Sequence, residues 1–265
     1  MLGGLQLNKR VYQCRDTVDS IFTAIYDAWA SKYGHDNIRI DVVLEKDETY
    51  NFEFFTEYIK VDEDFEKAKK VAASIPKKIS NEAYDLVINA ACSDRLDKGD
   101  IIYRFLIIGF SLGSNVVNHL TNEVVMNIFE LSRNVSVERH HFTGFLRFSQ
   151  INSSLLLAKL KPKNDIIRMI ATHFSDRLPN EDFIIYDEGR NSVIIHPANS
   201  QWIYSKFEDK EFENLIKIDD IEEEYSVLWK TFFDSICIKE RRNLKLQRNN
   251  LPLRYRSNMD EFKSK

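Results

Sequence analysis

The stretch that decides the fold is residues 155–204, LLLAKLKPKNDIIRMIATHFSDRLPNEDFIIYDEGRNSVIIHPANSQWIY. Leu155–Leu160 is an apolar run of strand length, and Asp165–Leu178 then carries apolar residues at helical spacing. Short apolar runs separated by turn residues such as Glu188-Gly189 follow, and they are typical of strands. These three predicted strands are Phe183–Tyr186, Ser192–His196 and Gln201–Tyr204.

The same pattern extends to both sides of this stretch. Phe145–Phe148 predicts a further strand, joined to Leu155–Leu160 through Asn152-Ser153. Ile221–Ile236 repeats apolar residues at intervals of three and four, which predicts an amphipathic helix. The order of two strands, a helix, three strands and a helix favours an antiparallel sheet with helices packed on one face.

Helices dominate the first half of the sequence. Short strands are predicted at Val11-Tyr12 and at Ile38–Leu44, and the remaining segments have helical periodicity. The predicted class is therefore α+β, with a helix-rich N-terminal half and an antiparallel sheet with packed helices in the C-terminal half. Residues 1–265 form either a single compact domain or two lobes, 1–142 and 143–265. The predicted helices are Val18–Trp29, Asp62–Ser74, Asn81–Cys92, Lys98–Leu112 and Thr121–Arg139.

The charge of the chain is nearly balanced and unevenly distributed. Its 265 residues include 37 basic and 41 acidic side chains, a formal net charge of -4, so the whole molecule has no field that attracts DNA or an anionic membrane. Any contact with nucleic acid therefore requires a local basic patch. Asp41–Glu66 holds ten acidic and two basic residues, which is typical of a solvated face or of a surface for a basic partner.

Cysteine usage and hydropathy indicate a cytoplasmic protein. Cys14, Cys92 and Cys237 are far apart and odd in number, a pattern of reduced thiols without a metal-binding pair, so we expect no metal and no cofactor. Ile101–Val117 is the most apolar stretch, but it is too short and too polar for a membrane span, and we expect a buried helix. Met1–Leu7 is too short for the core of a signal peptide.

The clearest candidate for nucleic-acid binding is the segment Lys239–Arg256, with seven basic residues and one acidic residue. In a helix, Arg241, Lys245 and Arg248 would share one face and could meet successive phosphates. The alternative is that these side chains pair with acid-rich surfaces of the protein itself. Arg147, next to Phe145 and Phe148, could stack on a base or could be an edge-strand charge. The nucleic-acid candidates are Arg241, Arg242, Lys245, Arg248 and Arg147.

Two polar clusters could carry chemistry. Glu138 with His140 could form an acid/base pair, although a histidine at a helix end more often caps or packs. His173 and Arg177 lie one helical turn apart, and Asp187 and Arg190 flank the next turn. These four would form a polar pocket for a phosphate or carboxylate if they converged, or a salt-bridged junction between helix and sheet. The catalytic candidates are Glu138, His140 and His173, and the pocket candidates are Arg177, Asp187 and Arg190.

Several ordered motifs resemble a bacterial family catalogued as probable DNA-metabolism proteins. The resemblance implies association with a radical-SAM protein of DNA modification or repair, and in some relatives fusion to a uracil-DNA glycosylase domain. It supplies no catalytic residues. The motifs that carry it are Leu106, Gly109-Phe110, His119-Leu120, Glu138, His140, Gly144–Phe148, His173-Phe174, Arg177, Pro179, Asp187, Trp229, Phe232-Phe233, Glu240–Asn243, Gln247-Arg248, Pro252 and Tyr255.

These observations lead to three functional hypotheses. The first is an accessory protein of DNA metabolism or repair, which works with the radical-SAM partner and contacts DNA through its basic C-terminal segment. Standard hydrolase motifs are absent from the sequence, so catalysis is expected in the partner. The second is an enzyme acting on a nucleotide or damaged base through Glu138 and His140. The third is a protein-binding scaffold.

Overall fold

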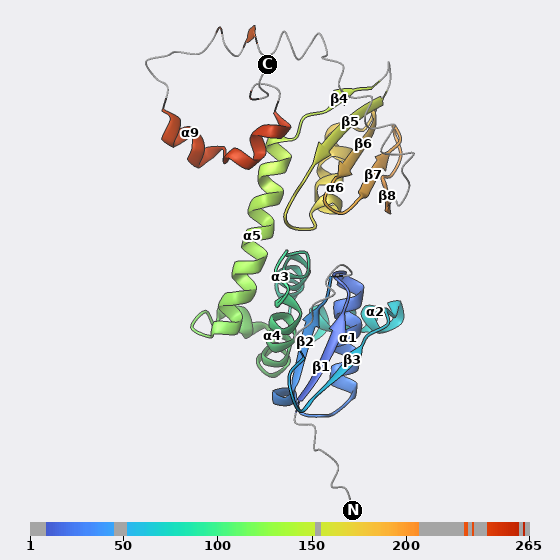
Figure 1. The fold of residues 1–265 in the computed structure, drawn as a ribbon, viewed down its shortest axis with the longest axis vertical. Helices are drawn as coiled ribbons and strands as arrows, with labels where there is room; N and C mark the ends of the chain where they lie inside the picture. The colour runs from blue at the N-terminus through green and yellow to red at the C-terminus, as the bar shows by residue number, and fades with distance from the viewer. Residues whose placement is uncertain are drawn as a thin grey trace, which may run out of the picture. The chain divides into compact units, whose positions relative to one another are not determined.

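The computed structural model describes residues 9–44, 52–151, 155–206, 231, 232, 235, 243–259 and 262. The chain divides into two units, Met1–Ser136 and Val137–Lys265, and both helices and sheets are present, which confirms the α+β class (Figure 1). The helix predicted over Ile221–Ile236 lies, apart from three isolated residues, outside the described residues.

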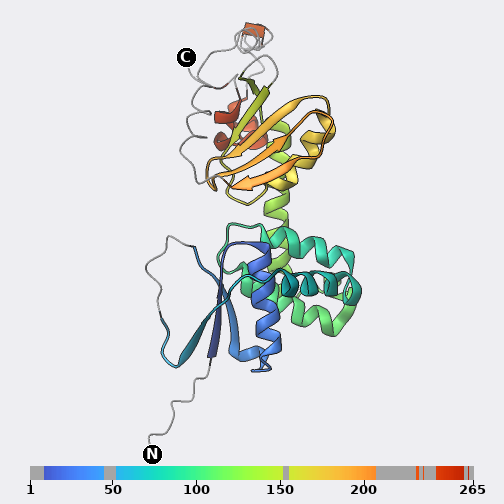
Figure 2. The same ribbon diagram turned by 90° about the vertical axis from the view of Figure 1, so that its right-hand side faces the viewer.

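The first unit is built on a three-stranded parallel sheet with the order β2-β1-β3. Strand β1 is Lys9–Cys14, β2 is Ile38–Val42 and β3 is Thr56–Lys60. Helix α1, Val18–Ala30, connects β1 to β2, and the helices of this unit lie on one face of the sheet (Figure 2). Strand β3 was not predicted, because it lies within the acid-rich segment that was interpreted as a solvated face.

Helices α1, α2 and α3 begin at side-chain caps. Thr17 Oγ1, Asp64 Oδ1 and Ser80 Oγ accept backbone N–H groups of the first turn, which those helices would otherwise leave unpaired. The apolar faces of the unit's helices then form one core with β1 and β2. The elements are α2 Phe65–Lys78, α3 Asn81–Ala91, α4 Lys98–Leu112 and α5 Glu123–Phe145, with short 3-10 turns η1 His35–Asn37 and η2 Gly113–Asn118.

Helix α4 contains the most apolar sequence of the chain. With η2 it forms the segment Lys98–Asn118. By length and composition alone this segment could cross a membrane, and among the described residues it is the one helical segment of which this is true. Ile102, Tyr103, Phe105 and Leu106 are nevertheless fully buried in the core of the first unit. The face that carries these residues packs into the core, whereas Leu112 at the end of α4 is exposed.

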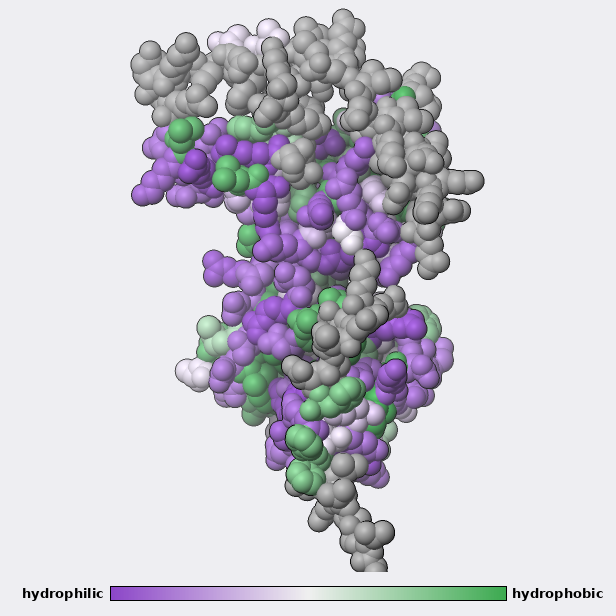
Figure 3. Space-filling view, in the orientation of Figure 1, coloured by the Kyte–Doolittle hydropathy of each residue, from purple (hydrophilic) through white to green (hydrophobic). Residues whose placement is uncertain are grey.

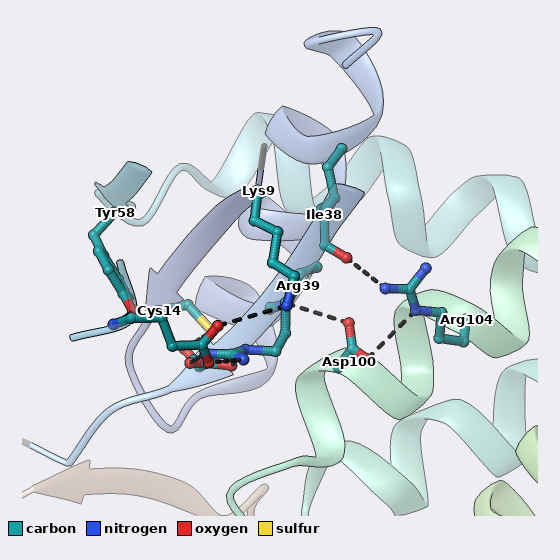
Figure 4. Close-up of polar contacts among 10 residues, drawn as sticks. Lys9, Cys14, Ile38, Arg39, Tyr58, Asp100 and Arg104 are labelled. Carbon is teal, nitrogen blue, oxygen red and sulfur yellow. Dashed lines mark hydrogen bonds and ion pairs between the residues drawn. The ribbon is translucent and has the colours of Figure 1, made fainter. Parts of the chain in front are cut away.

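Helix α4 also covers the outer edge of β2. The Arg104 guanidinium donates to the carbonyl of Ile38 (2.5 Å) and pairs with Asp100, whose carboxylate accepts the N–H of Ile40 (3.4 Å) (Figure 4). At Gly99 a Cβ would lie 2.9 Å from Ile40 Cγ2 and 3.1 Å from the Ile40 carbonyl oxygen. Glycine therefore permits the close approach of α4 to the strand.

The second unit contains a five-stranded mixed sheet with the order β4-β5-β6-β7-β8 and helix α6, Ile167–Arg177. The antiparallel prediction is wrong for one pair, because α6 returns the chain so that β5 and β6 run parallel. The other neighbouring pairs are antiparallel. The strands are β4 Ser149–Gln150, β5 Leu155–Leu160, β6 Asp182–Asp187, β7 Ser192–His196 and β8 Ile203–Lys206.

The strand predicted at Phe145–Phe148 is also wrong. Helix α5 continues through Gly144 to Phe145, and β4 begins only at Ser149. The helix is extended here because Phe142 and Phe145 contact the ring of Tyr255, with centroid distances of 5.1 and 5.8 Å. Tyr255 belongs to the short 3-10 segment η5, Leu253–Asn258, which follows helix α9, Leu244–Asn250.

Candidate functional site

Glu138 lies on α5 with 2% of its surface exposed and holds a loop of the sheet. Its carboxylate accepts the backbone N–H groups of Lys163 (3.1 Å) and Asn164 (2.8 Å) and the side-chain amide of Asn164 (2.6 Å). Arg254 Nη2 lies 3.1 Å from the same carboxylate. A carboxylate with these partners is bound on both oxygens, and it joins α5, the loop after β5 and η5.

The basic C-terminal segment is anchored at this point. Tyr255 is 1% exposed, and Leu251 and Met259 are also buried. The Tyr255 ring lies against α5, and burial raises the pKa of its phenol, which accepts a hydrogen bond from Arg254. The segment from Leu251 to Met259 is therefore fixed by apolar contacts and by the ion pair with Glu138.

The candidate catalytic residues are not brought together. His140 is exposed, whereas Glu138 is buried two positions earlier on the same helix, so the two side chains leave the helix in different directions. The neighbouring His141 stacks on Phe145, and burial lowers the pKa of its imidazole, with contributions from His140 and Arg254. His173 is exposed on α6, where its ring contacts Phe174.

Asp187 and Arg190 do come together. Asp187 is fully buried at the end of β6 and accepts the N–H groups of Gly189 (2.9 Å) and Arg190 (3.3 Å). Burial raises the pKa of this carboxyl, while the Arg190 guanidinium, 3.4 Å away, acts in the opposite direction. Arg190 also donates to the carbonyls of Pro162 and Lys163. Glu138 and Arg190 therefore hold the same loop from different elements.

Arg177 lies apart from this cluster. It ends α6, after which the chain enters β6 at Asp182, whereas Asp187 is at the other end of that strand. A strand of this length separates its ends by roughly 17 Å. Arg177 therefore does not converge with Asp187 and Arg190, and His173 is exposed on α6. The Asp187–Arg190 pair instead ties the end of β6 to the loop after β5.

The basic candidates have different surroundings. Lys245 and Arg248 are exposed on α9, and neither makes an ion pair within the part of the chain that the structure describes. Asn243 caps this helix by accepting the N–H of Leu246 (3.0 Å). Arg147 donates to the carbonyls of Gly144 and Leu146, so it is held against the end of α5. Arg241 and Arg242 lie outside the described residues.

The charge of the second unit is nearly balanced. From Val137 to Lys265 the sequence holds 21 Lys or Arg and 20 Asp or Glu, and two of those acids, Glu138 and Asp187, are buried. Figure 3 shows hydrophilic side chains over much of the face of this unit that is in view. Within this unit the basic residues gather in the segment Lys239–Arg256, so any attraction for nucleic acid is local to that segment.

The first unit holds a buried cation that no sequence pattern reveals. Lys98, at the start of α4, is 1% exposed and donates to the Asp16 carboxylate and the Ser93 carbonyl. Close by, burial raises the pKa of the Cys14 thiol to about 12, so this cysteine is not a nucleophile at neutral pH. Among the described residues no group of three or more His, Cys, Asp or Glu could hold a metal ion.

Sequence patterns also give no sign of a hollow beside the end of α6. Its wall includes His196, at the end of β7, and Trp202, just before β8. Neither residue belongs to a motif or a charge run, so only the folded sheet brings them together with the end of α6.

The fold and these surfaces define an α+β protein whose second unit carries an anchored basic segment. The chain belongs to the family described as a domain of unknown function, DUF4130, whose model matches residues 96–261. The matched region begins just before α4 and includes the second unit as far as η5, but not the three-stranded sheet. No curated protein and no solved structure shows a detectable match to the chain.

Proposed function

We propose that the protein is a cytoplasmic accessory factor of DNA metabolism or repair that contacts nucleic acid through its basic C-terminal segment. The observation that carries this proposal is the exposure of Lys245 and Arg248 on a helix whose following residues are anchored by Tyr255. Cationic side chains on a fixed backbone can contact successive phosphates of a nucleic acid. Lys245 and Arg248 form no ion pair with an acidic residue that the structure describes, so both charges remain for such contacts.

The proposal places the chemistry in a partner, a radical-SAM protein of DNA modification or repair. The motif resemblance supports this partner. The buried, fully hydrogen-bonded Glu138 supports a non-catalytic role for this chain, because a general acid or base must reach its substrate.

The test is DNA binding as a function of salt. A K245A/R248A double variant is expected to bind short single- and double-stranded DNA about tenfold or more weakly at low salt. Its plot of log affinity against log salt should be shallower by about 0.9 for each duplex phosphate that the variant no longer neutralises. The matched control is K69A/K77A, which removes two exposed lysines from α2 in the first unit. Equal binding by the parent and K245A/R248A would contradict the proposal.

A protein-binding role receives support from the first unit. Phe52, Phe54 and Phe55, just before β3, are 70, 92 and 56% exposed. Such adjacent aromatic side chains are unusual on a free surface and typical of a contact with another protein. An F54S variant is expected to copurify less with the radical-SAM protein while DNA binding stays unchanged. Undiminished copurification would remove this role for Phe54.

A further inference from the structure

The hollow in the second unit lies between the end of α6 and the segment that joins β7 to β8. Its volume is about 680 Å³, large enough for a nucleoside. The residues that matter for its chemistry are Asp176, Pro179, His196, Asn199, Gln201 and Trp202.

One wall of the hollow is fixed before any ligand arrives. The N–H of Ala198 donates to Asp182 Oδ1 (2.7 Å), and the N–H of Asn199 donates to the Pro179 carbonyl (2.6 Å). Asn199 has a φ of 59°, a left-handed conformation that asparagine tolerates better than most residues. A wall tied to β6 and to the turn that follows α6 loses little conformational freedom on binding, which favours affinity.

His196 presents a hydrogen-bond acceptor to this hollow. The residue is only 2% exposed, and its ring stacks on Phe183 at a centroid distance of 4.4 Å. Nδ1 lies 3.1 Å from the Glu181 carbonyl, which can only accept, so Nδ1 carries the proton. In the neutral ring Nε2 is then an acceptor, and it has no partner among the residues that the structure describes.

Two other groups complete the recognition surface. Asp176 is exposed and contributes a carboxylate, a second acceptor. Trp202 is half-buried and lines the hollow, and an indole in such a position can stack on a planar ligand. Asn199 and Gln201 add amides that can donate or accept.

We propose that this hollow binds an unpaired guanine base, stacked on Trp202, with its N1–H and 2-amino group donating to Asp176 and His196. Guanine carries two adjacent donors on the edge that pairs with cytosine, whereas adenine and cytosine carry a ring acceptor there that would face the acceptors of the hollow. The base could come from a free nucleoside or nucleotide, or from single-stranded DNA. The DNA source rests on the function proposed above.

The first experiment uses uncharged ligands, which the basic C-terminal segment does not attract. Titration calorimetry of the full chain is expected to show deoxyguanosine binding, with deoxyinosine about tenfold weaker because it lacks the 2-amino group. Deoxyadenosine is expected to bind more weakly still. Equal affinity for deoxyguanosine and deoxyinosine, or no binding of either, would overturn the proposal.

Variants locate the site. W202A and D176N are each expected to weaken deoxyguanosine binding about tenfold or more, while W202F retains most of it through stacking. The control E188Q removes an exposed carboxylate at the turn between β6 and β7, at the opposite end of β6. A thermal melt of each variant confirms folding. Unchanged binding by folded W202A and D176N would exclude this hollow as the site.

The DNA arm separates the two proposals. A single-stranded oligonucleotide with one guanine is expected to bind tighter than the same strand with inosine, and W202A should abolish that difference without changing the salt slope. K245A/R248A should lower the affinity for both strands but leave deoxyguanosine binding intact. Deoxyguanosine binding without DNA binding would retain the hollow and reject the DNA interface, and the opposite result would reject the hollow alone.

Discussion

Each unit contains a buried charged side chain that joins separate segments of the chain, and the two side chains have different partners. In the first unit, Lys98 joins the end of β1 to the start of α4, and its partner Asp16 is 30% exposed. In the second unit, Glu138 joins α5 to a loop 25 residues later and to Arg254. Both side chains join segments that are far apart in the sequence. Glu138, however, accepts three hydrogen bonds in addition to its ion pair, whereas Lys98 has two partners, so the second unit should depend more strongly on its buried charge.

The largest expected effect tests this dependence directly. E138A leaves the N–H groups of Lys163 and Asn164 and the Asn164 side-chain amide without their acceptor, and we expect a decrease of about 3–5 kcal/mol in unfolding free energy from these unpaired donors. Urea denaturation measures it, and hydrogen exchange should show faster exchange at the amides of Lys163 and Asn164. The milder E138Q should fall between parent and E138A, because its amide still fills the space. A decrease for E138A no greater than for E188A, at an exposed site, would contradict the comparison.

The corresponding change in the first unit should cost less. K98M keeps the length of the side chain and leaves Asp16 in contact with water, so the main penalty is the unpaired Ser93 carbonyl, about 1–3 kcal/mol. The same denaturation experiment measures it. If K98M proves more destabilising than E138A, the first unit depends more strongly on its buried charge than the second, and the comparison is wrong.

A third substitution probes the packing of the first unit without any charge. G99A places a Cβ against the side chain and carbonyl of Ile40, and we expect a decrease of about 1–2 kcal/mol in unfolding free energy from this overpacking. Gly144 provides the control, since a Cβ there meets no atom within 4 Å, and G144A should be neutral or stabilising. Equal effects of the two changes would show that α4 can move away from β2.

The smallest effect is a pH dependence that both units share. Burial raises the pKa of Asp187 and of Asp100, so the folded state binds these protons more tightly than the unfolded state. Their contribution to stability is complete below the unfolded value of about 3.9 and is lost as pH rises through the folded pKa. Over that window the parent should therefore lose stability relative to D187N. The difference for D100N should have the same sign and a smaller size, because Asp100 is partly exposed. Urea denaturation from pH 3 to pH 7 measures this difference in unfolding free energy. A parent that gains stability relative to D187N as the pH rises would contradict the prediction.

The local elements were largely predictable, since periodicity and caps act over a few residues. The helix α6 and the three strands after it match the sequence pattern closely. The end of α5 was not predictable, because Phe145 is helical through contacts with Tyr255, 110 residues later. The parallel pairing of β5 with β6 likewise depends on how α6 returns the chain, which periodicity does not encode.

Some residues of the candidate site could be selected from the sequence, but their contacts with one another could not. Lys245 and Arg248 were selected from the charge run, and both are exposed on α9, while their contact with nucleic acid stays a prediction. Glu138 was selected as an acid/base candidate because it stands near two histidines. Its partners Asn164 and Arg254 are remote in sequence, so its role as a structural acceptor appeared only in the fold. His196 and Trp202 lie in no motif, and a charge or periodicity search passes over them.

The covered edge of β2 restricts how molecules of this protein can pair with one another through their sheets. An uncovered strand at the margin of a sheet recruits the strands of other molecules, the first step toward aggregates. Arg104 and Asp100 occupy the outward backbone groups of Ile38 and Ile40, so recruitment at β2 would require α4 to separate first. We therefore expect the R104A variant to aggregate on storage. Its aggregation should be faster than its decrease in unfolding free energy alone would explain.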